Sequence, residues 1–374
     1  MKHKTEDPYL WERLVSFENL HSAFKKAAKG RRGRASVAVF EQNLETALPE
    51  LRQELLEGRY QPGNYVSFMI HDPKKRRISA APFRDRIIHH ALCNIIEPLF
   101  ERKFIFDTYA NRVGKGTHKA LNRCTHFMRR FGYVLPMDVK QFFPSIDHQI
   151  LLATIYHAVR NPRIRDLCAL VLENGKDVFR DEYEMVYFPG DDLLAVNHSR
   201  GLPIGNLTSQ FWANVYLNPL DHFIKRVLKC KGYVRYVDDL LLFSNDRAEL
   251  GDWREQIIQF LAGLRLTAHE NSAQARPTRT GVPFLGFQVF TDHRRLKRRK
   301  VVHARRRLMA LSEKYKHGKV DEKNVHARVN SWISHASHGD TYRLRLAMFS
   351  KIRFVRPTGG TIDAKTIADF QQNL

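Results

Sequence analysis

The most informative stretch of this sequence for predicting the fold is Tyr233-Val-Arg-Tyr-Val-Asp-Asp-Leu-Leu-Leu-Phe243. Apolar runs rich in aromatic and aliphatic side chains flank Asp238 and Asp239, which predicts two short strands with both aspartates at the tip of a tight hairpin. Adjacent carboxylates repel each other, and the arrangement becomes favourable when a divalent cation neutralises them. Asp-Asp is also an ordinary turn sequence, so the pair by itself leaves a metal site and a simple hairpin turn both open.

A third aspartate, Asp138, directly follows Tyr133-Val-Leu-Pro-Met137, which predicts a further strand. If this strand lies beside the hairpin, the three carboxylates converge. Hard oxygen ligands of this kind select Mg²⁺ or Mn²⁺. Two such ions about 4 Å apart activate a 3′-hydroxyl and stabilise the leaving pyrophosphate during an in-line displacement.

The charge balance narrows the class of partner. The chain has 374 residues, which allows two or three domains, with 62 Lys+Arg against 39 Asp+Glu and a formal net charge of +23. So large a charge disfavours a compact state through self-repulsion, which predicts a polyanionic partner, with nucleic acid ahead of an anionic membrane surface.

Cysteine usage and hydropathy argue against zinc-binding, disulfide-rich, secreted and membrane-spanning classes of protein. The four cysteines are scattered without a C-x-x-C pair, which argues against a zinc site or a disulfide framework and fits a reducing cytoplasm. The first residues lack the apolar run of a signal peptide, and the longest uncharged stretch, 201–220, is too polar to span a membrane. The sequence therefore predicts a soluble, cytoplasmic protein with no membrane partner.

Apolar spacing predicts the surrounding elements. The first 60 residues are expected to be helical, followed by a hairpin with strands 65–70 and 76–80 and a cationic tip over 71–75. Helices are expected at 85–100 and at 208–228, the second kinked at Pro219, and a final helix near 343–354. Between Arg294 and Arg307 there are nine Lys/Arg and no acidic residue, so we place a domain boundary near 290. Strands separated by helices of irregular length predict an α+β fold.

Several segments now resemble one known family. In order along the chain, Met137–Asp147, Gly201–Gln210, Tyr236–Asp239 and Phe284–Gly286 resemble motifs A, B, C and E of reverse transcriptases, and Arg77–Arg86 and Tyr109–His118 resemble the fingers motifs of that family. The resemblance runs from about residue 63 to 354. It implies a right-hand polymerase, with fingers, a palm built on an antiparallel sheet flanked by helices, and a helical thumb. The implied domains are an N-terminal helical extension (1–62), fingers (63–133), palm (134–290, with a fingers insertion around 148–200) and a basic helical thumb (291–374).

The resemblance implies an RNA-directed DNA polymerase that adds dNTPs to a 3′-hydroxyl with two Mg²⁺ ions, Mn²⁺ being an alternative, on template RNA and an RNA/DNA hybrid. Motif B usually begins Gln-Gly and here reads Ile204-Gly-Asn-Leu-Thr-Ser-Gln210, which is similar to diversity-generating retroelement reverse transcriptases of the group II intron-like lineage. Those enzymes copy a template RNA with errors opposite adenine and work with a small basic accessory protein. The alternatives are a phage-defence reverse transcriptase using a structured non-coding RNA, an RNA-templated RNA polymerase, and a non-catalytic RNA-binding scaffold of the same fold.

The resemblance also implies residue roles. Metal ions are assigned to Asp138, Asp238 and Asp239 with the carbonyl of Val139. The nucleotide-binding residues are Lys75, Arg77, Phe143, Gly205 and Gln210, with Phe143 as the steric gate against a 2′-hydroxyl. The template- and primer-binding residues are Arg112, Ser209, Tyr236, Phe284, Leu285, Gly286, Arg298 and Arg299, of which 284–286 form the primer grip.

Ordinary structural roles stay open for several of these residues. Phe143 fits a core aromatic residue, Arg77 a solvated turn, and Phe284 and Leu285 a buried strand end, while the cations of 294–307 fit a solvated helix face. In motif D the family usually has a lysine where Ser272 stands, so its role as a proton donor to pyrophosphate is in doubt; His269 is a candidate substitute.

Overall fold

The computed structural model describes residues 9–71, 75–176, 178–355 and 361–362. Its α-helices are α1 (Leu10–Leu14), α2 (Phe17–Ala28), α3 (Ala35–Gln42), α4 (Leu44–Leu56), α5 (Phe83–Glu101), α6 (Thr117–Arg130), α7 (Phe142–Ser145), α8 (His148–Ala158), α9 (Pro162–Glu173), α10 (Leu207–His222), α11 (Arg247–Gly263), α12 (Arg298–Lys316), α13 (Glu322–Ala336) and α14 (Tyr342–Phe349). Its strands are β1 (Val66–Ile70), β2 (Arg76–Ala80), β3 (Tyr133–Met137), β4 (Gly232–Tyr236), β5 (Asp239–Ser244), β6 (Arg276–Pro277), β7 (Val282–Phe284), β8 (Phe287–Val289), β9 (Arg294–Leu296), β10 (Phe354–Val355) and β11 (Thr361–Ile362). None of the described helices is both long and apolar enough to cross a membrane.

The chain forms two compact units. The first contains 1–116, 137–240 and 251–274, and the second contains 117–136, 241–250 and 275–374. All of the motif A, B and C residues belong to the first unit, whereas the primer-grip segment and the basic segment 294–307 belong to the second. The boundaries of the fingers, palm and thumb stay predictions.

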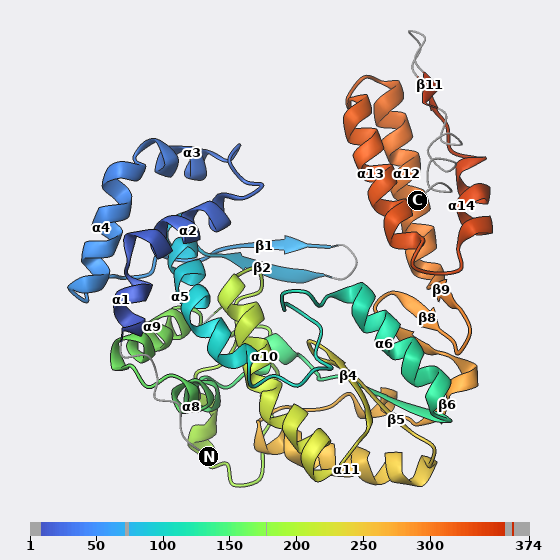
Figure 1. The fold of residues 1–374 in the computed structure, drawn as a ribbon, viewed down its shortest axis with the longest axis horizontal. Helices are drawn as coiled ribbons and strands as arrows, with labels where there is room; N and C mark the ends of the chain where they lie inside the picture. Colours follow the sequence, from blue (N-terminus) through green and yellow to red (C-terminus); the bar gives the residue numbers. More distant parts are fainter. Residues whose placement is uncertain (1–8, 72–74, 177, 356–360, 363–374) are drawn as a thin grey trace. The chain divides into compact units, whose positions relative to one another are not determined.

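Helices of the first 60 residues pack against α5 within the first unit (Figure 1). Helix α2 begins where the Ser16 hydroxyl accepts a hydrogen bond from the Asn19 N–H at 3.2 Å, as an N-cap does. Leu20 and Phe24 on its buried face are at most 2% exposed, and the Phe24 ring meets the edge of Phe83 on α5. The predicted helical character of the first 60 residues is confirmed from Leu10 to Leu56, residues 1–8 lying outside the described residues, and the predicted helix at 85–100 is confirmed.

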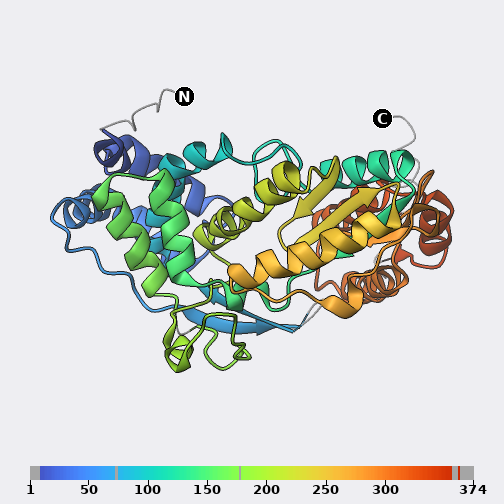
Figure 2. The same ribbon diagram turned by 90° about the horizontal axis from the view of Figure 1, so that it is seen from below.

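The long helix of motif B is also confirmed. Helix α10 contains Pro219 and runs on to His222, and a π-helix over Phe223–Val227 follows it. The kink at Pro219 stays a prediction. Helix α10 packs against α5 and α8. Helices α8 and α9 lie side by side (Figure 2).

The strands form the sheets that the sequence predicts. Strands β1 and β2 pair antiparallel from Val66↔Ala80 to Ile70↔Arg76, which confirms the predicted hairpin; residues 72–74 of its tip lie outside the described residues. Strands β4, β5, β3 and β6 form a four-stranded sheet in that order. The mixture of helices and antiparallel strands confirms the α+β class.

The second unit combines a three-stranded sheet, β7-β8-β9, with a helical bundle. Helices α12 and α13 lie side by side (Figure 1), and their contacting faces bury Leu311, Val329 and Ile333. The predicted final helix at 343–354 is too long, since α14 ends at Phe349. The chain turns there because Phe354 enters strand β10 and is fully buried in the core of the bundle.

Candidate active site

Asp138 stands at the end of strand β3, and its backbone is fixed by the motif D segment. The Asp138 carbonyl accepts a hydrogen bond from the His269 N–H at 2.8 Å, and the Lys140 N–H donates to the Thr267 carbonyl at 2.7 Å. An isolated antiparallel bridge joins Val139 to Ala268 between these two bonds. The backbone from which the Asp138 carboxylate projects is therefore held by the segment 267–269.

Asp238 lies in the turn between β4 and β5, as the sequence predicts. Burial raises the pKa of the Asp238 carboxyl to about 6, and the negative charge of Asp138 is the next largest cause; Arg76 and Arg235 oppose the rise. A carboxylate that raises the pKa of another carboxyl by its charge must lie near it, so Asp138 and Asp238 are neighbours. The turn itself is unusual, because Val237 has φ of 57°, a left-handed conformation that a β-branched residue rarely adopts.

These two carboxyls fit a divalent cation. They are oxygen donors in a partly desolvated position, and each raises the cost of ionising the other, a cost that a bound cation removes. Within the described part of the chain, no group of three His, Cys, Asp or Glu side chains has the arrangement of a metal centre. The structure thus makes neighbours of Asp138 and Asp238, while the contribution of Asp239 stays a prediction.

We expect Asp238→Asn to stabilise the metal-free protein at neutral and alkaline pH. Because the pKa is raised in the folded state, the proton is bound more tightly there than in the unfolded chain. The contribution of Asp238 to stability is therefore fully present below pH 4 and is lost as pH rises through 6, by up to about 3 kcal/mol. Thermal unfolding in EDTA at pH 5 and pH 8 checks this: the gain in Tm should be larger at pH 8. The exposed Asp252→Asn on α11 is the control, and a Tm lowered at pH 8 by Asp238→Asn would contradict the expectation.

Phe143 and its neighbour Phe142 have different environments. Phe142 is 2% exposed, whereas Phe143 is only partly buried, and the two rings meet edge to face with centroids 5.6 Å apart. The Phe143 backbone is held by the Leu202 N–H, which donates to its carbonyl at 2.9 Å. The core position is thus taken by Phe142, and the ring of Phe143 stays accessible, as a steric gate requires.

The motif B residues are positioned by strand β2. The Ser79 N–H donates to the Ile204 carbonyl at 2.9 Å. Gly205 has φ of 118°, and a Cβ there would lie 2.9 Å from a methyl carbon of Ile78, so this position requires glycine for packing against the hairpin. Its predicted approach to the nascent base pair stays a prediction. Ser209 is buried in α10 at 2% exposure, while Gln210 is exposed.

The basic residues Lys75, Arg77 and Arg112, predicted to bind nucleotide or nucleic acid, differ in how accessible their side chains are to a ligand. Lys75 is exposed beside the hairpin tip. The Arg77 guanidinium pairs with Glu182 at 2.8 Å and donates to the Val178 carbonyl at 3.1 Å, so a triphosphate would have to displace Glu182. Arg112, predicted to contact template or primer, is 7% exposed and paired with Glu101 at 2.8 Å. Because that guanidinium is already satisfied inside the protein, we leave Arg112 out of the proposed nucleic-acid contacts.

Hydrogen bonds to the backbone link the two motif D positions, His269 and Ser272, to Asp138. His269 and Ser272 are both exposed, and the Ser272 hydroxyl donates to the His269 carbonyl at 2.8 Å. Since the His269 N–H binds the Asp138 carbonyl, the histidine is the nearer of the two in the hydrogen-bonded chain. The proton-donor role stays a prediction for His269.

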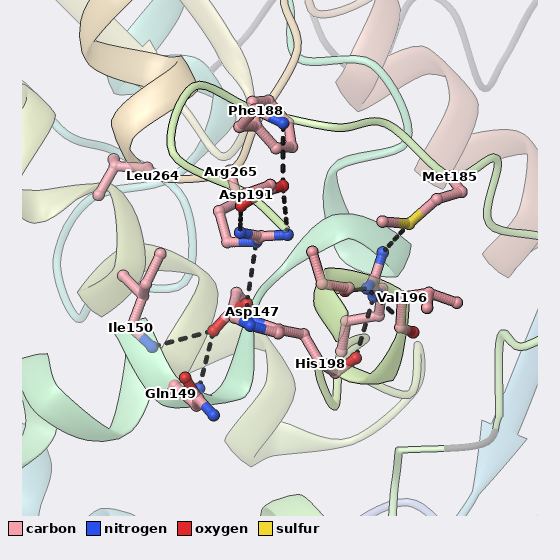
Figure 3. A network of polar contacts seen from close by, with 12 residues as sticks. Asp147, Gln149, Ile150, Met185, Phe188, Asp191, Val196, His198, Leu264 and Arg265 are labelled. Atoms are coloured by element: carbon pink, nitrogen blue, oxygen red, sulfur yellow. Dashed lines mark hydrogen bonds and ion pairs between the residues drawn. The ribbon is translucent and has the colours of Figure 1, made fainter. Parts of the chain in front are cut away.

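A polar network that the sequence did not reveal surrounds Asp147, the last residue of motif A (Figure 3). The Asp147 side chain is 3% exposed, and one of its oxygens caps helix α8 by accepting from the N–H groups of Gln149 and Ile150. The other oxygen accepts from His198 Nδ1 at 2.8 Å and pairs with Arg265 Nε at 3.2 Å.

Arg265 extends this network to Asp191, with which its guanidinium forms two contacts (Figure 3). The network joins helix α8, the insertion before motif B and the segment of motif D. The signal in the sequence was weak, because only the position of Asp147 directly before a helical pattern indicated a cap.

The predicted residues of the second unit lie in three environments: a buried strand end, a tight turn and an exposed helix start. Leu285 and Gly286 form the two-residue turn between β7 and β8, both with positive φ (47° and 90°), and Phe284 before them is 2% exposed. Phe284 therefore has the buried strand-end environment left open by the sequence. Arg298 and Arg299 are exposed at the start of α12.

Comparison with known proteins identifies the family. Residues 70–289 match the family described as reverse transcriptase (RNA-dependent DNA polymerase), and the chain belongs to this family, whose right-hand fold its helices and antiparallel sheets adopt.

The chain is 23% identical over 304 residues to Protein YkfC of Escherichia coli (strain K12), covering 71% of this chain and 76% of that protein. It is 25% identical over 216 residues to the group II intron-encoded protein LtrA of Lactococcus lactis subsp. cremoris, covering 56% of this chain and 33% of LtrA. A solved structure of apo telomerase from Candida Tropicalis matches with a TM-score of 0.49 at 9% identity, over 78% of this chain and 59% of that one.

Proposed function

We propose that this protein is an RNA-directed DNA polymerase that adds dNTPs to a 3′-hydroxyl with the help of two divalent cations. The observation that carries the proposal is the electrostatic coupling of Asp138 to Asp238 within a chain of the reverse transcriptase family. Two ionisable carboxyls kept together at the ends of neighbouring chain segments destabilise the protein unless they bind a cation. Such perturbed pairs occur mainly where chemistry needs them.

The roles of the residues follow from their positions. Asp138 and Asp238, with Asp239 and the Val139 carbonyl, would hold Mg²⁺. Held there, a divalent cation would supply Lewis-acid chemistry, lowering the pKa of the attacking hydroxyl and neutralising charge on the triphosphate. Phe143 would exclude a 2′-hydroxyl from the sugar site.

The partners follow from the family and from the charge. Template RNA and the growing RNA/DNA hybrid would contact exposed cations such as Arg298 and Arg299 in the second unit. A hybrid is recognised through its backbone and shape, so its affinity should fall steeply with salt.

Primer extension tests this proposal. The wild-type protein, given a primed RNA template, four dNTPs and Mg²⁺, should produce full-length cDNA, and the Asp238→Asn/Asp239→Asn double variant should produce none. The proposal is wrong if the wild type makes no product on any primed RNA, or if the double variant is equally active. Equal use of dNTPs and NTPs would instead favour an RNA-templated RNA polymerase.

We expect Phe143→Ala to weaken discrimination against ribonucleotides. Removing the ring opens space for the 2′-hydroxyl, so the ratio of kcat/KM for dNTP over NTP should fall about 10-fold or more. Single-nucleotide addition with dCTP and CTP measures this ratio. Phe142→Leu, which alters the buried neighbour, is the control and should leave the ratio near the wild-type value.

Within this class we infer an error-prone enzyme of a diversity-generating retroelement, with a small basic accessory protein as partner. Support comes from motif B, in which Ile204 replaces a glutamine whose polar contact to the incoming nucleotide is thereby lost. We expect Ile204→Gln to lower misincorporation opposite template adenine, as measured by sequencing cDNA, and an unchanged error rate would refute this assignment of Ile204. The alternative is a phage-defence role with a structured non-coding RNA, and a template RNA co-purifying with the protein distinguishes the two by its sequence.

A further inference from the structure

A charged pair is fully buried directly beneath the turn that carries Asp238. Arg235 on β4 and Asp221 on α10 both have side chains with 0% exposure. Their contact is bidentate: the Arg235 Nη2–Asp221 Oδ2 distance is 2.6 Å, and the Nε–Oδ1 distance is 2.8 Å. Burying two charges is costly even when they are paired, and an apolar pair of the same size is often at least as stable. The pair therefore calls for a reason other than stability.

The remaining hydrogen bonds of the Arg235 guanidinium indicate that reason. Its Nη1 donates to the carbonyl of Val237 at 3.0 Å and to Asn214 Oδ1 at 3.1 Å. The Val237 carbonyl belongs to the peptide bond that leads into Asp238. Val237 has φ of 57°, and a β-branched residue keeps such a conformation only where its surroundings impose it. The hydrogen bond from Arg235 is a contact that imposes it.

Further bonds hold Arg235 and Asp221 themselves in place. The Tyr233 hydroxyl donates to Asp221 Oδ1 at 2.8 Å, and Asn214 Nδ2 donates to the Ala110 carbonyl at 2.8 Å. The backbone of Arg235 is paired as well, since its N–H donates to the Asp107 carbonyl at 3.0 Å. A fully satisfied buried network of this kind has little freedom to move.

We propose that Arg235 is a positioning residue for nucleotide addition: anchored by Asp221, it holds the peptide between Val237 and Asp238 in the left-handed turn that aims Asp238 at its cation. This inference rests on the proposed function and adds to it a residue that touches neither substrate nor metal. Lysine at 235 would keep the positive charge beside Asp221, but a single ammonium cannot reproduce the planar fork that binds Asp221 and the Val237 carbonyl together.

The test compares Arg235→Lys with Arg165→Lys. Arg165 is in the same unit and also binds backbone carbonyls, those of Val159 and Tyr156, but lies in helix α9 away from the turn. For Arg235→Lys we expect kcat to fall about 10-fold or more with KM for dNTP within about 2-fold of wild type. The Mg²⁺ concentration for half-maximal rate should rise, while binding of an RNA/DNA hybrid should be unchanged. Arg165→Lys should leave all four quantities near wild type.

Two further measurements do not depend on polymerase activity. In Arg235→Lys, hydrogen exchange of the peptide 233–243 should speed up locally, and Mn²⁺ affinity, measured by electron paramagnetic resonance, should weaken. If the wild type proves inactive, the proposed function fails while these measurements still decide the role of Arg235.

A second variant covers the case in which Arg235→Lys does not fold. Tyr233→Phe removes only the hydroxyl that supports Asp221, and it should lower kcat and Mn²⁺ affinity by a smaller factor in the same direction. Unchanged exchange over 233–243 together with unchanged Mn²⁺ affinity in a folded variant would overturn the inference. So would a rise in KM with kcat unaffected.

Discussion

Asp138→Asn is expected to lower kcat for nucleotide addition about 10³-fold, equivalent to about 4 kcal/mol of transition-state stabilisation. Asparagine keeps the size of the side chain but loses the charge that, with Asp238, attracts a divalent cation. Because the Asp138 backbone stays paired to the motif D segment, the fold and the affinity for an RNA/DNA hybrid should be unchanged. Single-turnover primer extension and hybrid binding, measured on the same protein, check both expectations.

The control for this substitution is Asp166→Asn, an exposed carboxylate on α9. It removes the same charge from the same unit at a position outside motifs A to D, and it should retain at least half of the wild-type rate. An Asp138→Asn protein that polymerises at a rate close to that of the wild type would remove Asp138 from the metal site. A variant that has also lost hybrid binding would show that Asp138 acts on substrate binding instead.

Asp147→Ala is expected to cost about 3–5 kcal/mol of unfolding free energy. The substitution removes the cap of helix α8 and leaves the Nε of the partly buried Arg265 and the Nδ1 of the partly exposed His198 without their shared acceptor (Figure 3). Urea unfolding followed by circular dichroism measures the loss.

Asp147→Asn separates the two contributions, since its side-chain oxygen can still cap the helix while the charge is gone. It should lie between Asp147→Ala and the wild type. The comparison variant is Asp192→Ala, which removes another capping aspartate, from an exposed position before a single 3₁₀ turn, and should cost less than about 1 kcal/mol. A loss of the same small size for Asp147→Ala would mean that the network contributes nothing beyond the cap.

Local sequence patterns determined much of the fold in advance. Apolar spacing and turn residues act within a few residues of each other. They predict the hairpin around Asp238 and Asp239, strand β3 before Asp138, the β1–β2 hairpin and helix α10. The end of α14 did not follow from such patterns. The apolar spacing continues past Phe349, but helix α14 ends there, because Phe354 packs into the core of the bundle.

In the candidate active site, too, some features could be predicted from the sequence and others only from the tertiary structure. The sequence by itself predicted that Asp138 and Asp238 would lie close together, because each follows a predicted strand, and the structure makes them neighbours; their role as metal ligands stays a prediction. Only the tertiary structure showed that Arg112 is paired with Glu101 and that Gly205 lies against Ile78. It alone showed that Arg235 on β4 binds both the Val237 carbonyl and the buried Asp221 of helix α10. Long side chains can bind partners that are far away in the chain, and burial determines which of those partners must be charged. The partner that is bound depends on which distant segments pack together, and a local sequence pattern does not contain that information.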